Sequence, residues 1–413
     1  MGTEQIIVGL DVGTTKVCLL VGEIQEDGDL RIIGVGLEHS QGMSRGAVSD
    51  IGLVTEAIRS AKKQAERTSG YEISRALVSI AGQHISSINS RGVTGLNANR
   101  GVITQADVDR ALDSARAVAL PHNAEILHIV PRTYTLDGQE GVRNPLGLHA
   151  FRLEVEAHII TAATSSVQNL EKGVKDAGIM VDRFVLNPLA SAQATLTESE
   201  RESGVAVVDI GGGTTDLAVL IGGTVWHTSV IAVGGNHVTS DIAHVLHLPF
   251  DEAERIKIEY GHADASAVDR DDLVTVESFG EDFATQVLRR DLASIIEARA
   301  DEIFMLVLQE LKRSGYDGLL PAGTVITGGT AALPGIRETA RRVMNLPARV
   351  AKPEGLTGLV DKLNSPAFST SVGLLHFARQ TGLAETITPR PQRSRPNAIK
   401  WLGQLWGKLA PEE

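Results

Sequence analysis

One pattern occurs twice in the chain, and it restricts the possible folds more than any other feature of the sequence. An apolar stretch that starts at Ile6 leads into the turn Asp11-Val12-Gly13-Thr14-Thr15-Lys16 and then into a second apolar stretch that ends at Val21. Near the middle of the chain, two apolar stretches flank Asp209-Ile210-Gly211-Gly212-Gly213-Thr214-Thr215-Asp216. We interpret each copy as a β-hairpin, the second with two glycines inserted in its turn. Repetition at about half the chain length predicts two related domains that face each other across a cleft.

A third glycine-rich turn and several periodic segments complete the outline. The turn Thr327-Gly328-Gly329-Thr330 lies between a predicted strand at 325–327 and a predicted helix at 336–344. Further segments have clear periodicity: helical in 107–119, 165–177, 251–260 and 282–313, and strand-like in 153–161. Strands that alternate with helices in this way are typical of the α/β class.

Composition excludes several classes of protein. The 413 residues, 42% of them hydrophobic and 22% charged, are enough for roughly two to four domains with sizeable cores. A formal net charge of -12 disfavours binding to nucleic acid. The single cysteine, Cys18, has apolar neighbours and is expected to be a buried residue in a reducing compartment. No apolar run is long enough to span a bilayer, and the start of the chain lacks the pattern of a secretion signal, so we expect a cytosolic protein.

The glycine turns have the chemistry of a phosphate site. Glycine lets the backbone approach a ligand closely, and successive N–H groups with threonine hydroxyls can converge on phosphate oxygens. Lys16 adds a positive charge, and Asp11 and Asp209 could hold Mg²⁺ through water. The P-loop pattern is absent from the sequence, so a different phosphate cradle is expected. The predicted phosphate contacts are Asp11, Gly13, Thr14, Thr15, Lys16, Asp209, Gly211, Gly212, Gly213, Thr214 and Thr215.

These turns resemble those of the actin, Hsp70 and sugar kinase superfamily, and over essentially the whole chain the sequence is most similar to the bacterial FtsA family. Besides the two turns, the resemblance rests on Ser371-Val372-Gly373-Leu374-Leu375 and on a short amphipathic C-terminus. It implies a two-lobed actin-like ATPase fold with duplicated domains around a nucleotide cleft, an inserted α+β subdomain and a C-terminal amphipathic helix. The cofactors that it implies are ATP and Mg²⁺.

The resemblance also implies a division of the chain. The first domain core would consist of 1–82, 163–190 and 348–382, and the family-specific subdomain of 83–162 would be inserted in it. The second domain core would consist of 191–225 and 306–347, with an outer subdomain at 226–305. A flexible linker at 383–396 and a helix at 397–413 would follow.

Further nucleotide contacts are implied outside the phosphate turns. Glu254 and Lys257 match the helix that holds the ribose in such proteins, and their i, i+3 spacing puts both on one helix face. The alternative is an ordinary ion pair at the surface. Gly234 and Gly235 would line the same side of the site, with Gly328 and Gly329 under the adenine.

One position departs from the superfamily. Relatives have Glu or Gln where the attacking water is positioned, but here the segment reads Asn187-Pro188-Leu189. Asparagine is shorter and cannot act as a base. Gln193 is a possible substitute. We therefore expect ATP binding with at most slow hydrolysis, and no catalytic residue is assigned.

The C-terminal segment is predicted to bind a membrane surface. On a helical projection from Ile399, the apolar residues gather on one face and the glycines, lysines and Gln404 on the other. Tryptophans on an apolar face flanked by lysines suit an interfacial helix on anionic lipids. The alternative is that this face packs on the protein's own core. The predicted lipid contacts are Ile399, Trp401, Leu402, Leu405, Trp406 and Leu409.

By the resemblance, the protein would be a polymer-forming adaptor at the division septum, peripheral on the cytoplasmic face of the membrane. It would bind the C-terminal peptide of FtsZ, further copies of itself and later division proteins, and no nucleic acid. Arg289 and Arg290, beside Val287, Leu288 and Leu292 on one predicted helix, are candidates for the FtsZ site, although such a helix can also simply pack. A sugar kinase or another phosphotransferase of the same fold is the alternative. An Hsp70-type chaperone would need more than the roughly 30 residues that follow Gly382.

Overall fold

The structure is a computed structural model that describes residues 5–96, 101–279, 284–383 and 385–386. The tail helix expected at 397–413 and most of the linker expected at 383–396 lie outside the described residues. Within the described part of the chain, no helix is both long enough and apolar enough to cross a membrane.

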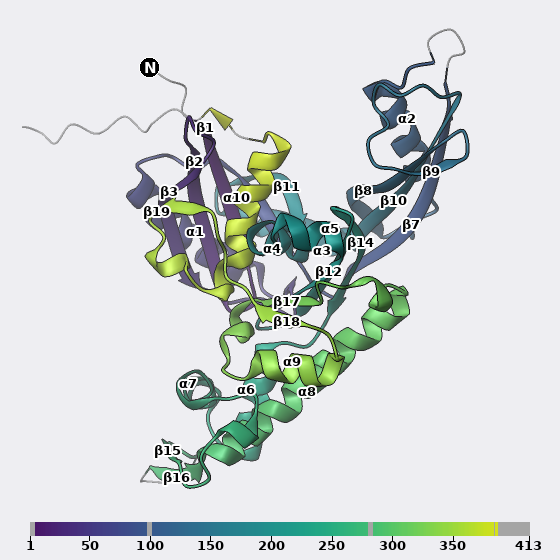
Figure 1. The fold of residues 1–413 in the computed structure, drawn as a ribbon. Helices are drawn as coiled ribbons and strands as arrows, with labels where there is room; N and C mark the ends of the chain where they lie inside the picture. The colour runs from purple at the N-terminus through teal and green to yellow at the C-terminus, as the bar shows by residue number, and fades with distance from the viewer. Residues whose placement is uncertain (1–4, 97–100, 280–283, 384, 387–413) are drawn as a thin grey trace, which may run out of the picture.

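Two mixed sheets with the same internal order form the body of the molecule (Figure 1). The first runs β11 (Met180–Leu186), β6 (Arg75–Ile80), β1 (Gln5–Val12), β2 (Lys16–Ile24), β3 (Leu30–His39), β19 (Leu356–Gly358), with β20 (Glu385–Thr386) also paired to β1. The second runs β18 (Ala348–Val350), β17 (Thr324–Thr327), β12 (Val205–Ile210), β13 (Thr215–Ile221), β14 (Thr224–Ile231). In each, three antiparallel strands are followed by parallel ones, which confirms the predicted duplication.

The register of the two hairpins corrects one detail of the sequence interpretation. Asp11 pairs with Cys18 in the first hairpin and Asp209 pairs with Asp216 in the second, so both turns have the same length. Each turn is also closed by the same 2.9 Å bond, from Gly13 N to Lys16 O and from Gly211 N to Thr214 O. No glycines are inserted. Gly212 and Gly213 instead occupy the places that Thr14 and Thr15 hold in the first turn.

Helices cover both faces of each sheet. On the first sheet, α1 (Ile51–Ser69) and α3 (Thr164–Asp176) bury one face. The other face is covered by α4 (Asn187–Thr195) and α10 (Ser369–Thr381), and α4 also contacts the second sheet. On the second sheet, one hydrophobic core is formed with side chains of four helices: α6 (Gly235–Val245), α7 (Phe250–Tyr260), α8 (Arg289–Ser314) and α9 (Ile336–Met344). The short α5 (Glu198–Ser203) precedes β12.

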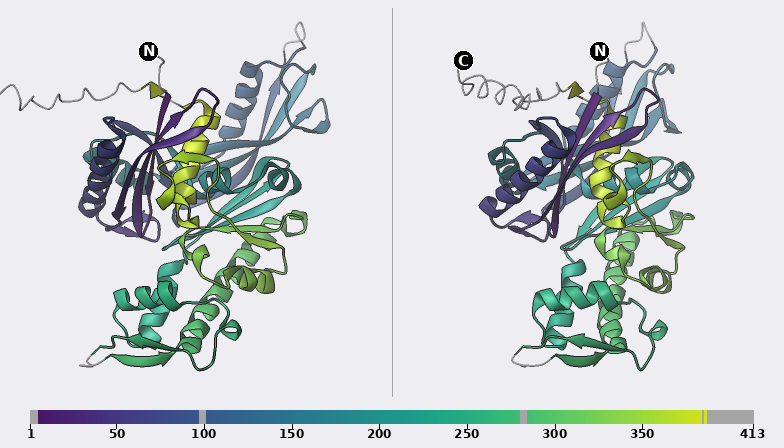
Figure 2. Two further views of the ribbon diagram at one scale, coloured as in Figure 1. Left: turned by 60° about the vertical axis from the view of Figure 1, so that its left-hand side comes forward. Right: turned by 90° about the vertical axis from the view of Figure 1, so that its left-hand side faces the viewer.

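An inserted sheet and an outer subdomain extend from opposite ends of this body (Figure 2). The insertion has the strand order β7 (Ile85–Gly95), β10 (Arg152–Ala163), β8 (Ala124–Leu136), β9 (Gln139–Val142), with α2 (Gln105–Arg116) packed on it. Elsewhere, β4 (Met43–Ser44) pairs with β5 (Ala47–Val48), and β15 (Leu273–Val276) pairs with β16 (Thr285–Leu288). The architecture confirms the predicted fold class of duplicated α/β domains with an α+β insertion.

Most predicted helices are present, but the longest was predicted to begin too early. The segments 107–119, 165–177, 251–260 and 336–344 correspond to α2, α3, α7 and α9. The helix predicted over 282–313 begins only at Arg289, because 285–288 form β16, where Val287 pairs with Val274. Val287 and Leu288 are therefore not on the helix that carries the two arginines, and the proposed apolar face beside them was wrong.

Candidate functional site

The two repeated turns meet face to face between the domains. A Cβ atom added to Gly212 would lie 2.2 Å from Oγ1 of Thr15, and one added to Gly213 would lie 2.5 Å from Oγ1 of Thr14. Each threonine of the first turn thus fills the space that a glycine of the second turn leaves. The contacts cross over, as expected for two equivalent turns related by an approximate two-fold axis.

Free backbone donors are concentrated where the turns meet. Among the described residues, the amides of Thr14, Thr15, Gly212 and Gly213 donate to no protein acceptor. Successive unpaired N–H groups in tight turns attract anions, since each retains a full hydrogen-bonding capacity. The arrangement therefore has the chemistry to receive a polyanionic group such as a di- or triphosphate.

The two turn aspartates are buried and held by hydroxyl groups. The carboxylate of Asp11 accepts hydrogen bonds from Ser79 Oγ (2.8 Å) and Ser371 Oγ (2.7 Å). Asp209 Oδ2 accepts from Ser191 Oγ and from Thr370 Oγ1 (2.9 Å).

Three of these hydroxyls come from α4 and α10, which pack so closely that a Cβ on Gly373 would lie 1.9 Å from Ala190 O. Both aspartates were predicted from the sequence, and Ser371 belongs to one of the motifs that carry the family resemblance, but no role was predicted for the hydroxyls. Ser369-Thr370-Ser371, three consecutive hydroxyl residues at the start of α10, was the signal that could have revealed two of them.

Burial raises the pKa of both acids that flank the second turn. It raises the pKa of Asp209, an effect that the hydrogen bonds from Ser191 and Thr370 oppose. Burial also raises the pKa of Asp216 well above its ordinary value, and the neighbouring Asp209 raises it further. One oxygen of Asp216, Oδ1, is buried without a hydrogen-bond partner. Asp216 closes the second copy of the motif, but no role was predicted for it from the sequence.

Lys16 supplies the positive charge at the first turn. Its Nζ lies 3.8 Å from Asp11 Oδ2, donates to the carbonyl of Ala367 and lies 5.1 Å from the ring centre of Phe368. With all of these partners, 31% of the Lys16 side chain remains exposed. The side chain is therefore available to an anion that enters between the turns.

The glycines predicted to line the ribose side lie directly against the second turn. Gly235 N donates to Gly211 O (2.9 Å), and a Cβ on Gly234 would lie 2.6 Å from the same oxygen. Lys257 Nζ and Glu254 Oε2 form a 2.6 Å ion pair beside these glycines. Lys257 also donates to Thr239 Oγ1 (2.9 Å) and Gly235 O (3.3 Å). Lys257 is thus buried and Glu254 part-buried beside the second turn, and the two do not form a solvated pair on an outer face.

The third turn completes the same cluster. Gly328 has a φ of +88°, and a Cβ there would lie 2.4 Å from Asp209 Oδ1, so only glycine fits this contact. Thr330 Oγ1 donates to Gly211 O (3.3 Å), and Gly329 follows Gly328 at the start of this turn. Every predicted nucleotide residue therefore belongs to one connected cluster, formed by the three turns, the start of α6 and the α7 pair Glu254 and Lys257.

A magnesium nucleotide fits this donor set. Four free amides and Lys16 could donate hydrogen bonds to the phosphates, while Asp11 and Asp209 could hold Mg²⁺ through water. The described residues contain no group of three or more acidic, histidine or cysteine side chains that could bind a metal by themselves. Two carboxylates beside a phosphate site are a donor set compatible with Mg²⁺, which keeps several waters and shares its coordination with substrate phosphates.

Comparison with known proteins identifies the family. The profile described as "Cell division protein FtsA" matches residues 206–373, and the profile "SHS2 domain inserted in FTSA" matches 82–161. The cell division protein FtsA of Neisseria meningitidis is 44% identical, with 98% of this chain and 97% of that protein covered. The corresponding values for FtsA of Pseudomonas aeruginosa are 43%, 91% and 90%. The chain belongs to the FtsA family.

Solved structures place this FtsA family member among actin-like folds. The PilM–PilN type IV pilus biogenesis complex matches with a TM-score of 0.65 and 15% identity, over 90% of this chain and 98% of that one. MreB5 of Spiroplasma citri bound to ADP matches with a TM-score of 0.54 and 14% identity, over 92% and 98%. At such identities the likeness concerns the fold alone.

Three further residues singled out in the sequence lie on helices rather than on the turns. Arg289 is at the start of α8 in the outer subdomain, where it donates to Tyr260 O (2.9 Å) and Asp272 Oδ2 (3.1 Å). Arg290 follows it on the same helix, and neither belongs to the cluster of turns. Asn187 is the first residue of α4, and its Oδ1 is buried without a hydrogen-bond partner.

Proposed function

We propose that the protein is an ATP-binding, actin-like adaptor that polymerises and links FtsZ to the cytoplasmic membrane during cell division. The observation that carries this proposal is the crossed contact of the two turns, with their free amides, in a member of the FtsA family. Membership supports the division role, and the turns support the nucleotide.

ATP would bind with its phosphates between the two turns. Lys16 and the free amides would hold the phosphates, and Asp11 and Asp209 would orient the waters of Mg²⁺. Glu254 and Lys257 would face the ribose, and Gly328 and Gly329 the adenine. MreB5 of Spiroplasma citri, which shares this fold, is bound to ADP in its solved structure, and this supports a nucleotide as the ligand. Hydrolysis would be slow, since Asn187 cannot act as a base.

The membrane and partner contacts are proposed from the sequence and the family. The tail, 397–413, would lie on anionic lipids through its apolar face, and the preceding linker would let it reach them. The insertion would contribute to filaments and to binding of later division proteins, and the outer subdomain would bind the FtsZ peptide. The division into cores, insertion and outer subdomain predicted from the sequence is retained as part of this proposal.

Co-sedimentation with vesicles tests the membrane and nucleotide parts together. The full chain is mixed with vesicles containing phosphatidylglycerol, with and without ATP–Mg²⁺ and an FtsZ C-terminal peptide. We expect sedimentation of the parent and loss of sedimentation for a chain with Trp401→Glu and Trp406→Glu, whose ATP affinity stays unchanged. Equal sedimentation of the two would contradict the anchor.

ATP binding is measured separately by equilibrium dialysis. Asp209→Ala and Gly212→Leu should each weaken binding more than tenfold, because the first removes a carboxylate near the ion and the second fills the space used by Thr15. Gly318→Ala is a matched control, since a Cβ there meets no atom within 4 Å. Parent-like affinity in both site variants would place the nucleotide elsewhere.

A further inference from the structure

A two-residue hairpin turn in the first domain has an unusual residue at its tip. Strands β4 and β5 pair around Arg45 and Gly46, whose φ angles are +48° and +77°. Turns of this kind favour Asn, Asp or Gly. The other described non-glycine residues with positive φ are Asp137, His247 and Asn345, which are residue types that adopt this region most readily. Arg45 is therefore held against its own backbone preference, and such strain is typical of functional sites.

The segment that carries this turn lies against both of the repeated glycine and threonine turns. Ser40 N donates to Thr15 O (3.0 Å) in the first turn. In the second turn, a Cβ atom added to Gly213 would lie 3.1 Å from Cα of Arg45. Gly213 has one of the four free amides of the proposed phosphate site. The hairpin therefore brings an arginine of the first domain to the edge of that site.

The backbone around the tip of the hairpin is packed tightly, so the tip has a fixed position. A Cβ atom on Gly46 would lie 2.7 Å from Ala81 O, just after β6. At the base of the hairpin, the amides of Ser49 (2.8 Å) and Asp50 (3.1 Å) both donate to Gly42 O. A tip that is already ordered loses little conformational entropy when a ligand binds to it.

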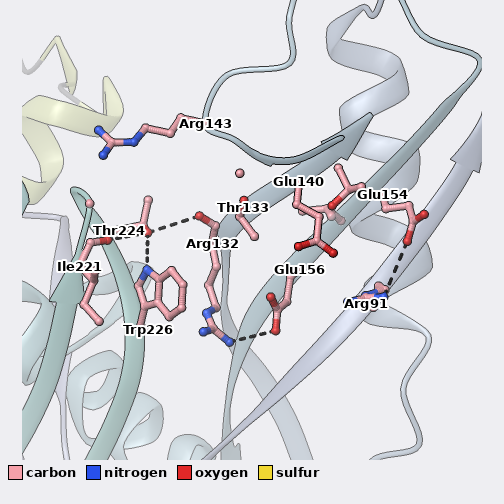
Figure 3. A pocket seen from close by; sticks show the side chains of 14 residues that line it. Arg91, Arg132, Thr133, Glu140, Arg143, Glu154, Glu156, Ile221, Thr224 and Trp226 are labelled. Carbon is pink, nitrogen blue, oxygen red and sulfur yellow. Dashed lines mark hydrogen bonds and ion pairs between the residues drawn. The ribbon is translucent and has the colours of Figure 1, made fainter. Parts of the chain in front are cut away.

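The side chain of Arg45 also differs from other arginines between the domains in having no partner. It is exposed, and within the described part of the chain it makes no hydrogen bond, ion pair or aromatic contact. By contrast, a cavity of about 530 Å³ between the insertion and the hairpin of β13 and β14 is lined by arginines that are neutralised (Figure 3). Their carboxylate partners lie within an ion-pair distance: Arg91 with Glu154 (4.0 Å), Arg132 with Glu156 (3.2 Å) and Arg143 with Glu202 (2.6 Å). The charge of Arg45 is therefore available to an anion, whereas the charges in the cavity are not.

The place of Arg45 along the second turn indicates which phosphate it would meet. Gly211 faces the side predicted to hold the nucleoside, since its carbonyl accepts from Gly235 N (2.9 Å) and Thr330 Oγ1 (3.3 Å). Gly213, two residues farther along the turn, meets Arg45 instead. A nucleotide with its base and ribose on the Gly211 side would direct its terminal phosphate toward the Arg45 side.

We propose that Arg45 binds the terminal phosphate of a nucleoside triphosphate and gives the site a preference for ATP over ADP. The inference rests on the proposed nucleotide site. Lys16 shares its charge with Asp11, 3.8 Å away, so a triphosphate needs a further cation. The planar guanidinium group can donate two parallel, charge-assisted hydrogen bonds to phosphate oxygens. ADP lacks the terminal phosphate and would gain nothing from Arg45.

Equilibrium dialysis of the full chain with two nucleotides tests this role. The ATP analogue AMPPNP has a terminal phosphate and resists hydrolysis, and ADP lacks that phosphate; both are used with Mg²⁺. We expect Arg45→Gln to weaken AMPPNP binding by about tenfold or more and ADP binding by less than about twofold. Arg45→Lys, which keeps the charge but not the planar fork, should weaken AMPPNP binding less. Arg67→Gln, at an exposed position in the last turn of α1, should bind both nucleotides like the parent.

A second variant separates binding from folding. Arg45→Gly removes the side chain, and glycine adopts a φ of +48° without strain. Its thermal stability without nucleotide should be no lower than that of the parent, while its AMPPNP affinity should fall as in Arg45→Gln. A side chain with a merely structural role would instead change the affinities for both nucleotides by the same factor.

The outcomes separate the role of Arg45 from the nucleotide site itself. A parent-like ratio of AMPPNP to ADP affinity in both Arg45→Gln and Arg45→Gly overturns the role of Arg45 and leaves the proposed function intact. A parent chain that binds neither nucleotide overturns the proposed function and this inference together.

Discussion

His158, buried between the insertion and the second domain, should make the stability of the protein depend on pH. Its ring bonds Asn89 Oδ1 through Nδ1 (2.8 Å) and Thr228 Oγ1 through Nε2 (3.0 Å). Burial, with smaller contributions from the nearby His227 and Arg132, lowers the pKa of His158 to about 3. The imidazole is therefore neutral in the folded protein throughout the physiological range.

The expected loss of stability follows from the two pKa values of this side chain. In the unfolded chain His158 takes up a proton near its ordinary pKa of 6.5, whereas in the folded protein it does so only near about 3. Its contribution is therefore complete above pH 6.5 and decreases as the pH falls toward 3. Each pH unit costs about 1.4 kcal/mol in this window, which gives about 2 kcal/mol at pH 5.

Urea unfolding at pH 7 and pH 5 measures this contribution. Trp226 lies on β14, beside the insertion, and its fluorescence reports the unfolding transition there. The measurement uses a background with Trp401→Phe and Trp406→Phe, in which Trp226 is the only tryptophan. His158→Gln keeps a donor and an acceptor but cannot be protonated, so the parent should lose about 2 kcal/mol more than the variant between pH 7 and pH 5. The other titrating groups are the same in both proteins, so their contributions to the pH dependence of stability cancel in this difference. His122→Gln, at an exposed position, should have the same pH dependence as the parent. The same pH dependence in the parent and in His158→Gln would refute the assignment.

Three further predictions concern α4, β2 and α10. Asn187→Glu should raise ATP hydrolysis by up to about 100-fold in a phosphate-release assay, and an unchanged rate would remove this position from the attacking water. Burial raises the pKa of Cys18 to about 12, so a thiol reagent at pH 8 should label it only after unfolding, and rapid labelling of the native protein would contradict its burial. Gly373→Ala, which directs a methyl group at Ala190 O, should cost about 1 to 3 kcal/mol in thermal or urea unfolding, whereas Gly318→Ala should be tolerated.

The sequence predicted those parts of the fold that depend on local pattern. The hairpins around Asp11 and Asp209 and the helix at 336–344 follow from periodicity and turn residues within a short window. The strand at 285–288 was missed because its partner, β15, is specified by pairing across a loop, and a four-residue strand before a long helix has too few residues to show its own period.

Contacts between elements distant in sequence could not be predicted in the same way. Ser79, Ser191 and Thr370 reach the two aspartates only after both sheets and the helices between them have formed. Arg132 likewise meets Trp226 only because the insertion packs on the edge of the other domain. A single sequence shows which residues have the chemistry to bind a ligand or to pair, but not which surfaces the folded topology brings together.

The two turns have the same length but different residues, and the way in which they meet explains the difference. Two turns that meet through an approximate two-fold axis place position four of one turn against position five of the other. Had the second turn kept Thr-Thr at these positions, four branched side chains would compete for a space that now holds two, and the backbones could not approach. Gly212 and Gly213 therefore complement Thr14 and Thr15. Divergence after duplication has preserved the backbone of the turn while dividing its functions, with hydroxyl groups on one side and close backbone approach on the other.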